Sequence, residues 1–167
     1  MRALLLANRA DADPGFVGDD LAARGYRFVV CPREHPNDWP ALDDVDLVVS
    51  LGSDWSVYWE AVADSVAAEE ALLRAAHHAG VPILGICFGA QMLAHSLGGS
   101  VARAPQAEIG WFGVESDIPE IAGSGPWFQW HADRFDPPPP ARLLGISPLA
   151  NQAFCLGRSL AVQFHPE

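Results

Sequence analysis

The first half of the chain alternates short apolar runs with segments of helical periodicity. Four runs have the length of buried strands, and they cover residues 2–6, 26–30, 45–50 and 81–86. Three segments carry the composition or spacing of helices, and they cover residues 16–24, 61–78 and 88–97. Gly25, Gly80 and Gly98 follow these three segments as helix stops. The alternation predicts an α/β fold: an open, mostly parallel sheet with helices on both faces.

The second half of the chain is rich in strands instead. Its apolar runs predict strands over residues 100–103, 109–115, 127–131, 142–147, 152–156 and 160–164. A chain of 167 residues is long enough for one compact core and too short for two comfortable ones. We therefore expect a single domain over residues 1–167, with a strand-rich second half.

Composition and charge narrow the classes of partner. The formal net charge is −11, and all ten basic residues are arginines. An acidic chain without basic clusters argues against nucleic acid and against an anionic membrane as partners. No segment approaches the length of a transmembrane helix. The three cysteines are an odd number without paired or metal-type spacing, so we expect a reducing, cytoplasmic location.

Cys87 stands between Gly85 and Gly89, at the junction of a predicted strand and a predicted helix. The pattern Gly-x-Cys-x-Gly is typical of a nucleophile elbow, a tight turn in which side chains at the glycine positions would collide with backbone. Such a turn puts the thiol at the carboxyl edge of the sheet and at a helix N-terminus, which favours the thiolate. The backbone N–H of Phe88 would point to where an oxyanion forms. The alternative is that Cys87 is a small buried residue.

The sequence His165-Pro166-Glu167 follows the last predicted strand. Pro166 fixes its own φ and favours extended geometry at His165, so the imidazole and the carboxylate project in defined directions. A histidine near a cysteine can take its proton, and a carboxylate behind the histidine orients the ring. His131, followed by Asp133, is a competing base at the end of a predicted strand. Only His165 has the Pro-Glu context.

Two segments far apart in the chain resemble a known family. Gly85-Ile-Cys-Phe-Gly-Ala-Gln91 and Gln163-Phe-His-Pro-Glu167 are similar to motifs of the class I (triad) glutamine amidotransferases, in particular of GMP synthase-like amidotransferase domains. Residues 51–58 resemble the oxyanion loop of that family. Residues 108–111 and 130–133 resemble two further recurrent segments, so the likeness covers essentially the whole chain.

The resemblance implies a cysteine-dependent amide hydrolase that releases ammonia from glutamine. Cys87 would form a γ-glutamyl thioester, His165 would carry the proton, and Glu167 would orient His165. The resemblance also implies an oxyanion hole and a substrate site, made by the backbone N–H groups of Ser53 and Phe88 and by Gly52, Gln91, His131, Ala132 and Asp133. Ammonia would pass to an ammonia-accepting synthetase subunit. Neither a metal nor an organic cofactor is implied.

The sequence departs from the family in two places. The loop reads Gly52-Ser53-Asp54, where the family usually has Gly-Gly-Pro. The family also continues beyond the triad carboxylate, so we expect a C-terminal segment to be lacking after Glu167. Two alternatives stay open: a hydrolase of γ-glutamyl peptides or γ-glutamyl amides with the same triad, and an inactive binding or regulatory subunit.

The remaining histidines and the tryptophans predict no separate site. The spacing of His35, His77, His78, His95 and His131 is not typical of a metal site. The tryptophans, including Trp111, Trp127 and Trp130, are expected to pack in the core or to line the rim of the active site.

Overall fold

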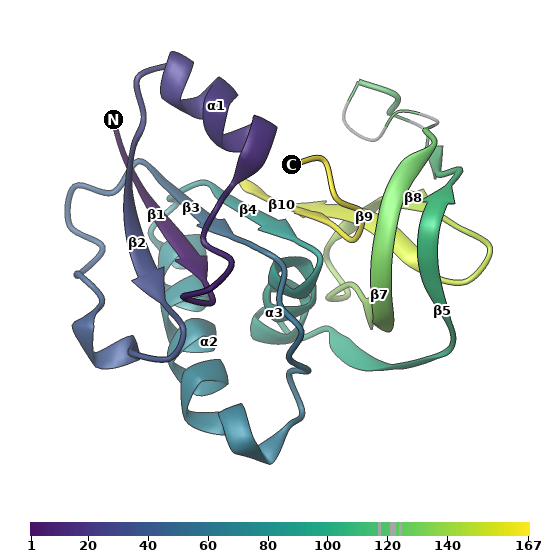
Figure 1. Ribbon diagram of the computed structural model, residues 1–167, viewed down its shortest axis with the longest axis horizontal. Coiled ribbons are helices and arrows are strands. Elements are labelled where there is room, and N and C mark those ends of the chain that lie inside the picture. Colours follow the sequence, from purple (N-terminus) through teal and green to yellow (C-terminus); the bar gives the residue numbers. More distant parts are fainter. Residues whose placement is uncertain (117, 121–122, 124) are drawn as a thin grey trace.

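The computed structural model describes residues 1–116, 118–120, 123 and 125–167. Within these residues, eight strands form one sheet in the order β2-β1-β3-β4-β10-β9-β8-β6 (Figure 1). In chain order they are β1 (Arg2–Ala7), β2 (Arg27–Pro32), β3 (Leu47–Ser50), β4 (Ile83–Ile86), β6 (Glu115–Ser116), β8 (Arg142–Ile146), β9 (Asn151–Leu156) and β10 (Ser159–Val162). The strands from β2 to β10 in this order pair in parallel, and β9, β8 and β6 continue the sheet in antiparallel pairing.

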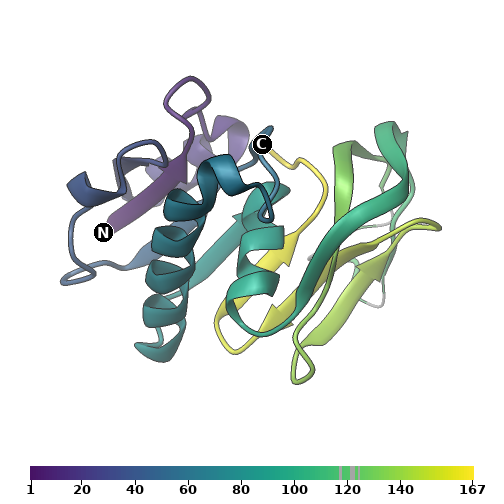
Figure 2. The same cartoon turned by 90° about the horizontal axis from the view of Figure 1, so that it is seen from below.

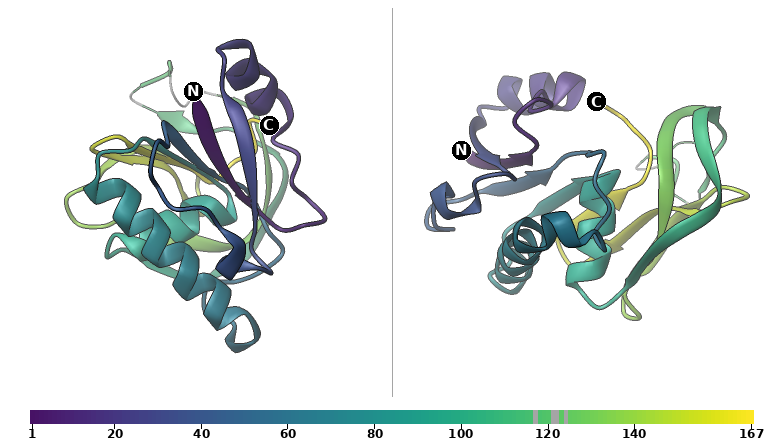
Figure 3. Two further views of the ribbon diagram at one scale, coloured as in Figure 1. Left: turned by 90° about the vertical axis from the view of Figure 1, so that its left-hand side faces the viewer. Right: turned by 60° about the horizontal axis from the view of Figure 1, so that its bottom comes forward.

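Helices cover both faces of the sheet, as the sequence predicts. Helix α1 (Gly15–Ala23) lies on one face, and α2 (Ala63–His78) and α3 (Phe88–Ser96) lie on the other, as the right-hand view of Figure 3 shows. A short 3₁₀ turn, η1 (Pro36–Asp38), precedes β3, and a second one, η2 (Glu60–Val62), precedes α2. No helix in the described ranges has both the length and the apolar composition needed to cross a bilayer.

The alternation of side chains along β1 divides the core in two. Leu4 and Leu6 pack in the cluster that includes α2 and α3 side chains, whereas Ala3 and Leu5 pack in the cluster that includes Val17 of α1. This division follows from the period of two in a strand, which sends successive side chains to opposite faces. Because both faces are buried, the strand reads as a continuous apolar run.

A two-stranded antiparallel ribbon stands beside the sheet (Figures 1 and 2). It consists of β5 (Ser100–Phe112) and β7 (Trp127–Asp136). The prediction of separate strands at 100–103 and 109–115 is wrong, because one strand spans residues 100–112 and absorbs the irregular stretch in a register shift between Arg103 and Glu108. The predicted strand at 127–131 continues to Asp136. Pairing with a distant strand therefore decided both boundaries.

The carboxyl ends of β3, β4 and β10 lie at one edge of the sheet, because these strands are parallel neighbours. Gly89, in the first turn of α3, lies directly against the end of β3. A Cβ atom built on Gly89 would be 2.0 Å from the Ser50 carbonyl oxygen, and one on Gly85 would be 2.5 Å from the Gly89 oxygen. The predicted collision of side chains with backbone at both glycines is therefore confirmed.

Gly89→Ala should destabilise the fold by about 3 kcal/mol or more, because the added methyl overpacks against backbone that has nowhere to move. Gly80→Ala is the matched control, since Gly80 has a φ of 72° and open space around its missing Cβ. It should lose only about 1–2 kcal/mol, the cost of the left-handed backbone conformation. Urea denaturation measures both, and equal losses would contradict the assigned role of the contact with Ser50.

Candidate active site

Cys87 lies at the turn between β4 and α3 with φ 53° and ψ −108°. This is a left-handed conformation, which costs a residue with a side chain about 1–3 kcal/mol and is concentrated at functional sites. The Cys87 N–H donates to the Val162 carbonyl at 2.8 Å, so the strained residue is anchored to β10. The side chain is buried, with 4% of its surface exposed. The elbow predicted from the glycine spacing is thus present.

His165 and Glu167 follow β10, the parallel neighbour of β4. His165 Nδ1 lies 2.8 Å from Glu167 Oε1, and the His165 N–H donates to the Phe128 carbonyl at 2.9 Å. A Cβ atom built on Gly52 would be 3.4 Å from His165 Cε1 and 3.6 Å from Cys87 Cβ. Gly52 therefore packs against both side chains, and the structure brings the three predicted triad residues to the same edge of the sheet.

The electrostatics of His165 reflect its two neighbours. Burial lowers the pKa of His165, but hydrogen bonding and charge from Cys87 and Glu167 outweigh burial and raise this pKa to about 10. His165 Nε2 is buried and has no hydrogen-bond partner within the described ranges. Hydrogen bonds between catalytic side chains are often long in a protein without substrate.

The predicted oxyanion donors lie on two adjoining segments. Phe88 begins α3, directly after Cys87, and Ser53 belongs to the loop that follows β3. The Gly89 N–H donates to the Leu51 carbonyl at 3.1 Å and ties this loop to the elbow. Within the described part of the chain, the backbone N–H groups of Ser53 and Phe88 have no hydrogen-bond acceptor. Both donors are thus free for a ligand.

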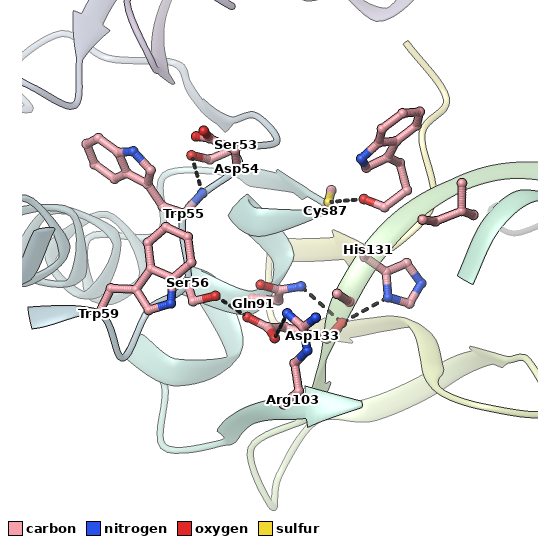
Figure 4. A pocket seen from close by; sticks show the side chains of 13 residues that line it. Ser53, Asp54, Trp55, Ser56, Trp59, Cys87, Gln91, Arg103, His131 and Asp133 are labelled. Carbon is pink, nitrogen blue, oxygen red and sulfur yellow. Dashed lines mark hydrogen bonds and ion pairs between the residues drawn. The ribbon is translucent and has the colours of Figure 1, made fainter. Parts of the chain in front are cut away.

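Two cavities of about 270 Å³ each adjoin Cys87. Ser53, Asp54 and Trp130 line both of them together with Cys87. The first cavity (Figure 4) also contains the remaining predicted substrate residues except Gly52, and its other lining residues are Trp55, Ser56, Trp59, Gln91, Arg103, Ile109, His131, Ala132 and Asp133. The second cavity contains Gly52, His165 and Glu167, together with Asp11, Asp13 and Leu51. Cys87 therefore lies between two cavities.

Gln91 and Asp133 meet at the floor of the first cavity. Gln91 Nε2 donates to the Asp133 carbonyl at 3.3 Å, and the Asp133 carboxylate accepts from Ser56 Oγ at 2.5 Å (Figure 4). The same carboxylate accepts from Tyr58 Oη at 2.8 Å. Arg103 Nη1 lies 3.9 Å from the same carboxylate. No role for Ser56, Tyr58 or Arg103 was predicted from the sequence. The only signal for Ser56 and Tyr58 is that they are polar side chains two residues apart in the predicted oxyanion loop.

The predicted position of His131 at a strand end is wrong, because β7 continues to Asp136. His131 occupies the middle of β7, and Figure 4 shows its ring turned away from Cys87. Its Nδ1 is 2.9 Å from the backbone oxygen of Asp133, and its Nε2 is 3.2 Å from the Glu108 carboxylate, directly opposite on β5. Burial lowers the pKa of His131, although the hydrogen bond with the Asp133 carbonyl and the charge of the Glu108 carboxylate act to raise it. The ring is a core group.

The tryptophans divide into three environments. Trp127 stacks on Phe164 with ring centroids 4.6 Å apart, as expected of a core residue. Trp130 lines both cavities and places its carbonyl oxygen 3.8 Å from the Cys87 sulfur, as expected of the rim. Trp111 is 70% exposed and lies on the same face of β5 as Ile109, which lines the first cavity, and its ring packs edge-on against Phe128.

Comparisons with known proteins identify the family of the chain. The profile of the family described as Glutamine amidotransferase class-I matches residues 21–167. The chain is 43% identical over 99 residues to the GMP synthase (glutamine-hydrolyzing) of Thermomicrobium roseum, covering 53% of this chain and 18% of that protein. It is 36% identical over 129 residues to the GMP synthase (glutamine-hydrolyzing) of Clostridium botulinum, covering 72% and 24%. The chain thus spans less than a quarter of the length of these relatives.

Solved structures give the same result over nearly the whole chain. The crystal structure of a glutamine amidotransferase from Thermotoga maritima aligns with a TM-score of 0.86 and 32% identity, over 99% of this chain and 75% of that one. A glutamine amido transferase from Methylobacillus flagellatus aligns with a TM-score of 0.83 and 28% identity, over 99% and 69%. The chain belongs to the class I glutamine amidotransferase family.

Proposed function

We propose that the chain hydrolyses the side-chain amide of glutamine to glutamate and ammonia, with Cys87 as nucleophile, His165 as acid and base, and Glu167 as the orienting carboxylate. The observation that carries the proposal is the strained Cys87, at φ 53°, at the same sheet edge as the His165–Glu167 pair. Side chains held in such a conformation are concentrated at active sites. Membership of the family supports the same activity.

In the first half of the reaction, the Cys87 thiolate attacks the amide carbon and forms a carbon–sulfur bond. The amide oxygen takes up the negative charge, and the backbone N–H groups of Ser53 and Phe88 stabilise it, as preorganised donors do in a water-poor site. The His165 imidazolium gives its proton to the amide nitrogen. The carbon–nitrogen bond then breaks, and ammonia leaves a γ-glutamyl thioester on Cys87.

In the second half, His165 accepts a proton from a water molecule as the water oxygen attacks the thioester carbon. The same N–H groups stabilise the second oxyanion. When the carbon–sulfur bond breaks, glutamate departs and the Cys87 thiolate and the His165 imidazolium are restored. Glu167 holds the ring orientation and stabilises the imidazolium in both halves. The sum is glutamine plus water giving glutamate plus ammonia.

We assign the first cavity to the amino-acid head group of the substrate. Gln91, Arg103 and Asp133 supply an amide, a cation and a carboxylate there, which suits a group that carries both an ammonium and a carboxylate. Gly52 lies beside the amide end, where a Cβ atom would be in van der Waals contact with His165 and Cys87. The backbone from His131 to Asp133 completes the wall.

Ammonia released here would serve an acceptor enzyme. The relatives named GMP synthase (glutamine-hydrolyzing) support a synthetase as partner, because the present chain matches only a small part of each. Residues 1–167 would form one amidotransferase domain. The position of β10 between β4 and β9 supports this, because the last strand of the chain joins the two parts of the sheet.

The chain would act in the cytoplasm, where thiols such as the free Cys31, Cys87 and Cys155 stay reduced.

The second cavity supports one alternative, hydrolysis of a γ-glutamyl amide or peptide. It adjoins His165, on the side from which the leaving amine takes its proton, and has a volume of about 270 Å³. A leaving group larger than ammonia would lie there, next to Asp11, Asp13 and Asp54. The chemistry at Cys87 is the same in both reactions.

Cys87→Ala should reduce glutamate release from glutamine by at least about 10⁴-fold, as removal of a catalytic nucleophile does. The alanine still has to adopt the positive φ of Cys87, so the stability of the fold should change little. Cys155→Ala is the control, because Cys155 lies on β9 and lines neither cavity. Coupled assays of glutamate and ammonia measure the rates. Equal rates in the wild type and Cys87→Ala would refute the proposed nucleophile.

The pH dependence of His165 follows from its raised pKa. A group whose pKa rises from 6.5 to about 10 on folding stabilises the fold fully below pH 6.5, and this contribution is lost as the pH rises through 10. NMR titration should give His165 a pKa near 10 in the wild type and a lower pKa in Glu167→Gln. The free energy of unfolding should accordingly fall less between pH 6.5 and 10 in that variant than in the wild type. A wild-type pKa near 6.5 would mean that His165 is mostly neutral at pH 7 and above, and would contradict the imidazolium assigned to the resting enzyme.

A panel of γ-glutamyl peptides distinguishes glutamine from the alternative substrates. With ammonia as the natural leaving group, kcat/KM for glutamine should exceed that for every peptide, because Asp11, Asp13 and Asp54 line the second cavity and their charges repel a peptide carboxylate. Release that depends on Cys87 from peptides and not from glutamine would establish the γ-glutamyl hydrolase instead. An absence of turnover with either class would favour the inactive binding or regulatory subunit.

A further inference from the structure

Arg33 is a charged residue with no exposed surface, and it directly follows β2. Its Nε donates to Glu69 Oε2 of α2 at 2.7 Å, and its Nη1 donates to Asn8 Oδ1 at 3.1 Å. Its guanidinium carbon lies 4.8 Å from the centre of the Phe88 ring. The guanidinium is thus wedged between α2, the end of β1 and the elbow helix, beneath the candidate active site.

The remaining donors of Arg33 hold the loop after β3. Nη2 donates to the Leu51 carbonyl at 2.8 Å, and Nη1 donates to the Gly52 carbonyl at 3.1 Å. A guanidinium is a rigid fork of five N–H groups, so two successive carbonyls bound to it are fixed relative to each other. Arg33 therefore determines the orientation of two consecutive peptide planes.

The orientation of those planes decides where the Ser53 N–H points. In a trans peptide, the N–H of one residue is antiparallel to the carbonyl of the residue before it. The cis bond among the described residues is Gly125–Pro126, so Gly52–Ser53 is trans. With the Gly52 carbonyl turned inward to Arg33, the Ser53 N–H is turned outward, to the cavities that Ser53 and Cys87 both line.

The loop has little else to fix this orientation. Leu51 is anchored by its own N–H, which donates to the Leu6 carbonyl at 3.0 Å, and by the bond from Gly89. Beyond it, the Trp55 N–H donates to Ser53 Oγ at 3.1 Å, and no proline restricts residues 52–54. Because oxyanion donors act only when they are held in place beforehand, a loop of this sequence needs an external clamp.

Glu69 determines what kind of contribution Arg33 can make. Its carboxylate, 1% exposed, pairs with the guanidinium at 2.7 Å and also accepts from Ser50 Oγ at 2.6 Å. The pair is close to neutral as seen from the active site. Arg33 thus contributes the direction of its hydrogen bonds, not a long-range positive field.

We propose that Arg33 is a positioning residue for catalysis: it clamps the carbonyls of Leu51 and Gly52 so that the Ser53 N–H faces the developing oxyanion. The inference rests on the proposed glutamine hydrolysis and on Ser53 as an oxyanion donor. It differs from a purely structural ion pair, which would stabilise the fold without distinguishing one reaction of Cys87 from another.

Arg33→Lys tests the clamp, because lysine keeps the charge opposite Glu69 and loses the fork that reaches both carbonyls. We expect kcat for glutamine to fall by roughly 10²- to 10³-fold, the usual loss when one oxyanion donor is removed, with KM nearly unchanged. Alkylation of Cys87 by iodoacetamide should keep its wild-type rate, because displacement at a saturated carbon creates no oxyanion. Arg74→Lys is the matched control, since Arg74 also donates to a backbone carbonyl, that of Ser96 at 3.2 Å, away from the site. Its kcat should equal that of the wild type.

If Arg33→Lys does not fold, the double variant Arg33→Met/Glu69→Leu takes its place, because replacing a buried ion pair by apolar residues is often neutral or stabilising. The same loss of kcat with normal alkylation is expected. An unchanged kcat in the folded variant overturns the inference. So does a parallel loss of kcat and alkylation rate, which would show general damage to the elbow. A wild type that releases no glutamate through Cys87 overturns the proposed function itself, a result separate from either of these.

Discussion

The close approach of Gly89 to the Ser50 carbonyl is the contact on which the candidate site depends. It brings the first turn of α3 onto the end of β3, where the loop from Leu51 to Asp54 begins. With α3 held there, the chain can pass from β4 into the helix only through a residue with a positive φ, and that residue is Cys87. The strained backbone at Cys87 and the position of the adjacent loop therefore follow from one packing distance, which only glycine permits.

The sequence was most informative where a structural feature of the site depends on a short local pattern of residues. Gly85 and Gly89 predict the elbow because their need for space is a property of the turn itself. Pro166 makes His165 and Glu167 predictable in the same way, since it restricts the backbone between them. The parallel sheet follows from continuous apolar runs separated by helices. In each case the physical cause lies within a few residues of its effect.

The features that escaped prediction are set by long-range pairing. The continuity of β5 through its irregular middle depends on β7, and the central position of His131 depends on the same ladder. Arg33 gave no signal in the sequence, because the predicted strand ends at residue 30, whereas β2 continues to Pro32. Nothing near it in sequence indicates that it reaches residues 51 and 52, because those contacts exist only once β2, β1 and β3 lie side by side.

A polar layer joins the ribbon to the sheet. Gln129 on β7 donates to Gln152 on β9 at 2.8 Å, and Gln152 donates to Glu108 on β5 at 2.9 Å. All three side chains are fully buried. Apolar surfaces of similar size could slide past each other, whereas buried amides and a carboxylate lose their partners if the register moves. This layer therefore fixes the position of β7, and with it the Trp130 carbonyl beside Cys87.

The place of β10 in the sheet has a consequence for the order of assembly. It lies between β4 and β9, although it comes after both in the chain. On the ribosome, the elbow and its cysteine emerge while the neighbouring position in the sheet is still empty, and only the arrival of residues 159–162 joins the parallel and antiparallel parts. The same event delivers the histidine. In the nascent chain, the Cys87 thiol thus has no contact with His165, its proposed base, until the sheet closes, so the proposed reactivity appears together with the finished fold.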